Sequence, residues 1–149
     1  HHRGQLAQCN VESEAFVASN TDTPGMSYVQ NGRIGTTDKA TLASFTTHDV
    51  RTQLTLNAMA DTEVLIGDGV GSSVLERVPL IRVTRIGTAA RFAAVLEPLS
   101  KETVPTVRNV EWSEEGDAIL LRVKRLNRHD LIRVAGDWQT VTLREASPK

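Results

Sequence analysis

The chain has 149 residues, enough for one domain with one core, and its formal net charge is -1 at pH 7. Hydrophobic residues make up 40% of the chain and charged residues 23%, as in an ordinary globular domain. This composition lacks the basic excess of nucleic-acid and membrane-surface binders, and no apolar run reaches the roughly 18 residues of a membrane span. We therefore expect neither nucleic acid nor membrane as a partner.

The first half of the chain is predicted to consist of short strands. Extended patterns occur at 5–10, 14–18, 39–47, 50–59 and 62–66. The segment 20–35 contains a proline and three glycines and is predicted to be a long loop. The glycine-rich stretch 67–71 lacks the lysine and the following helix of a phosphate-binding loop, which favours a flexible loop over a nucleotide site.

Two apolar-rich runs follow, at 78–84 and 91–97, joined by a short segment that contains Gly87. This arrangement predicts a β-hairpin. Because both faces of each run carry apolar residues, both are predicted to be central strands of a sheet.

The last third alternates in the same way, at 107–112, 118–124, 131–134 and 138–143, with polar turns between the runs. No segment shows a sustained apolar stripe of period 3.6. About ten closely spaced strands predict an all-β chain that forms a single antiparallel β-sandwich or jelly-roll-like domain over residues 1–149.

Motifs of catalysis are absent from the sequence. Cys9 is the single cysteine, so neither an internal disulfide nor a paired-cysteine metal site can form. His48 and His129 lie in predicted turns without ligand-spaced neighbours, and no Gly-x-Ser-x-Gly elbow occurs. No catalytic residue is therefore assigned.

The aromatic residues Tyr28, Trp112 and Trp138 are able to stack on sugar rings, but the expectation is that they fill the core.

Three stretches carry a resemblance to a known family. Residues 62–71 read Thr-Glu-Val-Leu-Ile-Gly-Asp-Gly-Val-Gly, residues 77–83 begin with Arg-Val-Pro, and residues 90–98 end in Leu-Glu-Pro. In this order they resemble the C-terminal region of the heparinase II/III-like polysaccharide lyases, which include alginate lyases. The resemblance covers residues 1–98, and the remainder is similar only in being rich in strands.

The resemblance implies that the chain is a fragment of a larger lyase, joined to an N-terminal helical toroid. Such enzymes cleave uronate-containing polysaccharides by β-elimination, and their catalytic residues lie mostly in the toroid. The implied role of this piece is to support the substrate cleft without catalysis of its own, in the periplasm or outside the cell. An acidic polysaccharide, such as alginate or a glycosaminoglycan, is the implied partner.

The family also has a His-x-x-Gly segment whose histidine can bind a structural zinc. His1-His2-Arg3-Gly4 is similar to it, with His1 in the ligand position. The other ligands would lie upstream in the parent protein, so no cofactor is expected within this chain.

Arginine outnumbers lysine, and it forms bidentate pairs with carboxylates and sulfates. Arg82 and Arg122 lie on predicted strand faces and are the candidate substrate-binding residues. Two other functions stay open, a free-standing carbohydrate-binding module and an adhesion sandwich. Aromatic residues make up only 4% of the chain, which argues against a stacking platform, and the paired cysteines of immunoglobulin domains are missing.

Overall fold

The all-β prediction is confirmed: the computed structural model, which describes residues 4–17, 23–73 and 75–146, folds into three antiparallel sheets of four strands each. Sheet A has the order β1-β4-β5-β8 and consists of β1 (Gln5–Cys9), β4 (Thr41–Thr47), β5 (Val50–Leu56) and β8 (Ala94–Ser100). Sheet B has the order β2-β3-β6-β7 and consists of β2 (Glu14–Ala15), β3 (Gln30–Thr37), β6 (Thr62–Val70) and β7 (Arg77–Thr84). Sheet C has the order β12-β11-β10-β9 and consists of β9 (Val107–Glu115), β10 (Ala118–Arg125), β11 (His129–Val134) and β12 (Val141–Ala146).

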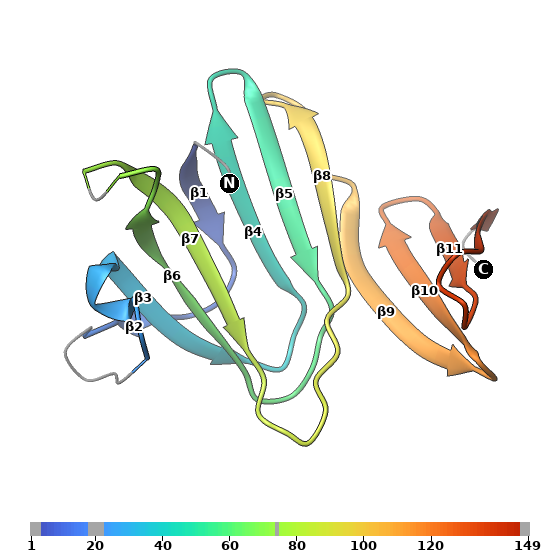
Figure 1. Cartoon of the computed structure of the whole chain (residues 1–149). Helices are drawn as coiled ribbons and strands as arrows, with labels where there is room; N and C mark the ends of the chain where they lie inside the picture. Colours follow the sequence, from blue (N-terminus) through green and yellow to red (C-terminus); the bar gives the residue numbers. More distant parts are fainter. Residues whose placement is uncertain (1–3, 18–22, 74, 147–149) are drawn as a thin grey trace.

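Sheet A lies between the other two sheets, as Figure 1 shows. Strands β5 and β8 contact β9 of sheet C, while β1 contacts β7 of sheet B. One short 3-10 helix, η2 (Met26–Tyr28), precedes β3. Within the described segments, no helix is both long and apolar enough to span a bilayer.

The core is divided between the sheets. On β6, Val64 and Leu65 point to opposite faces and are exposed by only 1% and 0%, so sheet B is covered on both sides. Between sheets A and C, the buried residues Val107, Val110 and Val123 form a second cluster. Each sheet thus buries apolar residues against a neighbour, as a sandwich requires.

The predicted hairpin of 78–84 and 91–97 is wrong. Strand β7 pairs with β6 and β8 pairs with β5, so residues 85–93 cross from one sheet to another. Both strands are edge strands and not central ones. Their second apolar face does not indicate a central position, because Val95 of β8 packs against the sheet C cluster while Leu96 on its other face is 65% exposed.

The crossing segment begins at a buried arginine. Arg85 is 8% exposed and makes no ion pair with a described carboxylate. It donates hydrogen bonds to Thr62 Oγ1 at 3.0 Å, to Asn57 Oδ1 at 3.0 Å and to the Arg91 carbonyl at 2.6 Å. Its guanidinium also lies over the Phe92 ring, 4.8 Å from the centroid. These contacts fasten sheets A and B together where β5 ends and β6 begins.

Two glycine-rich segments predicted as loops are strands. Strand β3, over residues 30–37, takes up the last six residues of the expected loop 20–35, and β6 extends through Gly67 and Gly69. Glycine is required at these positions because neighbouring segments lie too close for a side chain. A Cβ at Gly35 would lie 2.0 Å from the Glu12 carbonyl oxygen, and one at Gly67 would lie 2.8 Å from Val29 Cγ1.

The C-terminal meander is confirmed, with differences at its turns. The prediction that His129 lies in a turn is wrong: β11 begins at His129, which pairs with Lys124 of β10. Strands β9 to β12 pair consecutively, but β12 begins at Val141 and not at Trp138. Trp138 adopts a left-handed φ of 59° in the preceding turn, where Asp137 accepts hydrogen bonds from the Gln139 and Thr140 amides.

We predict that Gly35→Ala destabilises the fold by about 1–3 kcal/mol, because the new methyl group overlaps a backbone carbonyl that cannot turn aside. Gly87→Ala is the matched control, since its Cβ would find no atom closer than 3.5 Å, and it should change stability by less than about 0.5 kcal/mol. Urea unfolding followed by circular dichroism measures both. Equal midpoints for the two variants would contradict the close crossing at Gly35.

Candidate functional site

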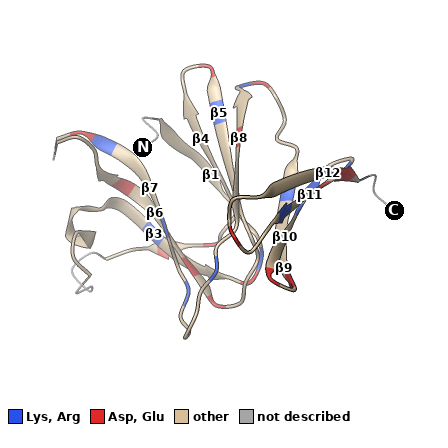
Figure 2. Cartoon of the chain, turned by 45° about the vertical axis from the view of Figure 1, so that its right-hand side comes forward, with Lys and Arg blue, Asp and Glu red and all other residues tan. Residues whose placement is uncertain are grey.

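One face of sheet C gathers basic side chains. Strand alternation and register place Arg122, Lys124, Arg133 and Arg144 on this face, which we call the basic face. Figure 2 shows Lys and Arg on β10 and β11. The opposite face carries Val110 and Val123 of the buried cluster and is turned toward sheet A.

Two arginines of the basic face form a row across the strands. Leu131 lies directly opposite Arg122 on one side and opposite Arg144 on the other. With about 4.8 Å between strands, their Cα atoms are about 10 Å apart. Both are exposed, and neither makes an ion pair with a described carboxylate. They are therefore able to bind two anionic groups of one extended ligand.

Other charges on this face are already paired. Glu111 forms an ion pair with Lys124 and accepts a hydrogen bond from Asn109 Nδ2 at 3.2 Å. Arg133 lies 3.9 Å from Glu115. The unbalanced positive charge is thus concentrated at Arg122 and Arg144.

Arg82, the other predicted substrate-binding residue, lies on sheet B and is not brought together with Arg122. Its NH2 group pairs with Glu63 Oε1 at 3.0 Å across the β6–β7 ladder. Its Nε is buried and has no described hydrogen-bond partner. Arg82 therefore has a neutralised charge, in contrast to Arg122.

The predicted zinc ligand His1 lies outside the described residues. Within residues 4–17, 23–73 and 75–146, no three His, Cys, Asp or Glu side chains are grouped to hold a metal. Cys9 is half-buried, and burial raises the pKa of its thiol, which disfavours the reactive thiolate.

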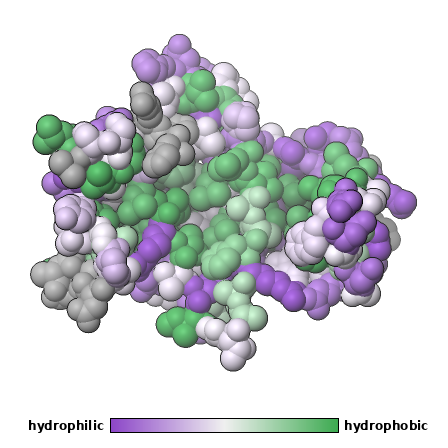
Figure 3. All heavy atoms as spheres, in the orientation of Figure 1, coloured by the Kyte–Doolittle hydropathy of each residue, from purple (hydrophilic) through white to green (hydrophobic). Residues whose placement is uncertain are grey.

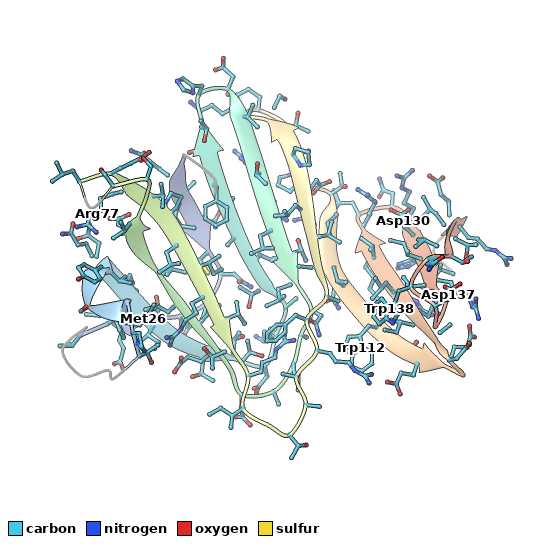
Figure 4. The ribbon with its side chains drawn as sticks, in the orientation of Figure 1. Met26, Arg77, Trp112, Asp130, Asp137 and Trp138 are labelled. Carbon is cyan, nitrogen blue, oxygen red and sulfur yellow. The ribbon has the colours of Figure 1, made fainter. Side chains whose placement is uncertain are left out.

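The aromatic residues differ from expectation in two of three cases. Tyr28 is 59% exposed and Trp138 is 70% exposed, so these two do not fill the core. Trp112 is half-buried, and the Arg91 guanidinium lies over its ring at 4.7 Å. Figure 4 shows both tryptophans on sheet C, with Asp137 beside Trp138 in the turn.

A polar joint, which sequence analysis did not identify, holds sheet C to sheet A. Glu97 of β8 is 8% exposed and accepts hydrogen bonds from Thr106 Oγ1 at 2.6 Å and from the Val107 amide at 3.2 Å. Arg125 of β10 lies 3.4 Å from Glu97 and 2.6 Å from the buried Asp130. Glu97 is thus a structural residue and forms no carboxylate pair with Glu111, which lies on the basic face.

The joint sets the ionisation of Glu97. Burial alone would raise the pKa of Glu97, but it is outweighed by the hydrogen bonds from Thr106 and Val107 and by the charge of Arg125. The net effect is a lowered pKa. The joint therefore stabilises the fold above the pKa of unfolded glutamate, about 4.3, and this contribution is lost as pH falls through the lower folded value.

We predict that Glu97→Gln lowers the free energy of unfolding at pH 7 by about 1–3 kcal/mol, because it removes a charged acceptor from the Thr106 hydroxyl and amide, the Val107 amide and Arg125. It should also remove part of the stability loss that the unaltered protein shows below about pH 4. Urea titrations between pH 7 and pH 3 measure this, with the exposed Glu102→Gln as control. Parallel pH curves for Glu97→Gln and the unaltered protein would refute the role of Glu97.

No family model matches the chain, and no curated protein matches it. Arg144 is the functional candidate that sequence reasoning missed. The alternating pattern of residues 141–146 predicts a strand. It does not show that Arg144 shares a face with Arg122, because that depends on the pairing of β12 with β11.

Proposed function

We propose that this chain is the C-terminal β-sandwich of a heparinase II/III-like polysaccharide lyase, and that its basic face binds the acidic polysaccharide while catalysis takes place in another domain. The observation that carries the proposal is the row of Arg122, Leu131 and Arg144. It presents two unpaired guanidinium groups on a rigid sheet, and guanidinium groups bind carboxylates and sulfates through paired hydrogen bonds.

The arrangement of sheet C favours an extended ligand. The basic face extends across β10, β11 and β12, whereas an enclosed pocket would select a small molecule. The apolar side chain of Leu131 between the two arginines offers a surface for the carbon face of a sugar. A polymer with regularly spaced carboxylates is able to contact both arginines at once.

The lyase assignment is tested by β-elimination, followed as the ultraviolet absorbance of the unsaturated product. Alginate, heparin, heparan sulfate and hyaluronan are each incubated with this chain and with a parent protein that contains it. We expect activity of the parent on at least one polymer and none of the chain alone. Activity of the isolated chain, or inactivity of both on all four polymers, would overturn the assignment.

The binding surface is tested separately. Arg122→Gln combined with Arg144→Gln should weaken binding of the preferred polymer at least tenfold at low salt, because two charge-assisted contacts are lost. Lys39→Gln combined with Lys101→Gln removes the same net charge elsewhere and is the matched control. Arg82→Gln should have a smaller effect, since Glu63 balances its charge. Isothermal titration calorimetry measures the affinity of all three variants. An equal loss of affinity in the lysine variant would show that net charge, and not the two arginines, causes the effect.

A second candidate function, a free-standing carbohydrate-binding module, is favoured by Trp138. Its ring is 70% exposed on a turn that Asp137 fixes, which suits stacking on a sugar. In that case Trp138→Ala should abolish binding of neutral oligosaccharides, measured by isothermal titration calorimetry. Full binding by Trp138→Ala would exclude the stacking role.

A further inference from the structure

A concave site lies on sheet B, apart from the basic face. It is a cavity of about 500 Å³ bounded by the start of β1 and by β3, β6 and β7. Its polar lining consists of Gln5, Asn31, Arg33, Asp68 and Arg77. This volume is within the range of small-molecule sites. Figure 4 labels Arg77 at the start of β7, and Figure 2 shows basic and acidic positions close together on sheet B.

Two arginines supply the positive charge of the cavity. The Nε–H of Arg33 donates a hydrogen bond to Ser13 Oγ at 3.1 Å, and its NH2 group donates one to the Ser13 carbonyl. The NH1 group of Arg77 donates a hydrogen bond to the Tyr28 carbonyl at 2.8 Å. Neither forms an ion pair with a described carboxylate. A guanidinium has five N–H donors, so each side chain is held by neutral oxygens and keeps donors for an anion.

One carboxylate faces the same cavity. Asp68 Oδ2 accepts a hydrogen bond from Asn31 Nδ2 at 2.7 Å, and its other oxygen has no described hydrogen-bond partner. A carboxylate beside two arginines is an acceptor for hydroxyl groups, because it cannot bind the anionic part of a ligand. The cavity thus combines donors for a carboxylate with an acceptor for hydroxyls.

The backbone at Asn31 is strained in a way that supports this arrangement. Asn31 has a left-handed φ of 50°, and the β3–β6 register shifts between Gln30 and Arg33. A bulge of this kind redirects a side chain out of the regular ladder. Here it directs the Asn31 amide to Asp68, and strain of this type is concentrated at functional sites.

We propose that this cavity binds a hydroxycarboxylic acid the size of one sugar acid, such as a single uronate. The two arginines hold the carboxylate, and Asp68 and Gln5 accept and donate hydrogen bonds to the hydroxyls. The site does not depend on the basic face of sheet C or on the polymer bound there. Its ligand is a small molecule or a chain end, because a cavity of about 500 Å³ accommodates about one sugar unit.

The test uses the whole chain and three probes, glucuronate, glucose and inorganic phosphate, in a titration followed by amide chemical shifts. Glucuronate should shift resonances around Asn31, Asp68 and Arg77, and glucose should bind at least tenfold more weakly because it lacks the carboxylate. Phosphate should also bind at least tenfold more weakly than glucuronate, since it offers no hydroxyl-bearing ring to Asp68. Absence of glucuronate binding, or equal binding of glucose or of phosphate, would overturn the proposal.

The residues are tested by matched variants. Arg33→Gln with Arg77→Gln should weaken glucuronate binding at least tenfold. Asp68→Asn should weaken glucuronate binding several-fold, whereas acetate, which has no hydroxyl group, should bind at least as tightly as to the unaltered protein. Arg122→Gln with Arg144→Gln should have no effect, which separates this site from the basic face. If the glutamine variants lower the melting temperature, Arg33→Lys and Arg77→Lys keep the charge and should still weaken binding several-fold. Unaltered affinity in the arginine variants would refute the site.

Discussion

The guanidinium of Arg85 joins the connection between β5 and β6 to the segment that leads from β7 to β8. Its partners come from the end of β5, the start of β6 and the crossing segment that leads to β8. Burial lowers the pKa of Arg85, yet arginine stays charged in proteins, so the group must be solvated by its neighbours. The amide and hydroxyl oxygens and the carbonyls provide this solvation without a carboxylate. The relative placement of sheets A and B, and with it the cavity beside β1, depends on that one hydrogen-bonded cation.

Sheet C is held by a different kind of contact. A small apolar cluster and the Glu97–Arg125–Asp130 network fasten it along β9, while its far strands are not covered by the described part of the other sheets. Figure 3 shows hydrophilic residues spread over the right-hand lobe and hydrophobic ones gathered at the centre of this view. The strands that carry Arg122 and Arg144 are thus fixed by their ladder and free at their outer face. This combination of a rigid frame and an open charged surface is what recognition of a long, flexible polyanion requires.

Sequence reasoning succeeded where the pairing is local. From 107 to 146 each strand pairs with the next, so alternation and turn residues were enough to place Arg122 on an exposed face. It failed where the pairing is not local, because β3 pairs with β6 and β5 pairs with β8. The glycines of β3 and β6 predict loops, since the close approach to Glu12 and Val29 that requires these glycines exists only in the folded chain. For the same reason Arg33, Asp68 and Arg77 show no pattern in the sequence, and only the bulged ladder brings them to one cavity.

Two of the edge strands contain a proline within their ladders. Pro79 of β7 lies opposite Asp68, and Pro98 of β8 lies opposite Thr52. A proline nitrogen has no hydrogen to donate and must point away from the paired neighbour, so the outward row of donors on each edge is interrupted. A further strand from another molecule would find an incomplete template there, which protects these sheets from growth into aggregates. The β12 edge has no proline between Val141 and Ala146. The other edge of sheet C, β9, contacts β5 and β8, so within sheet C intermolecular strand addition at high protein concentration should start at β12.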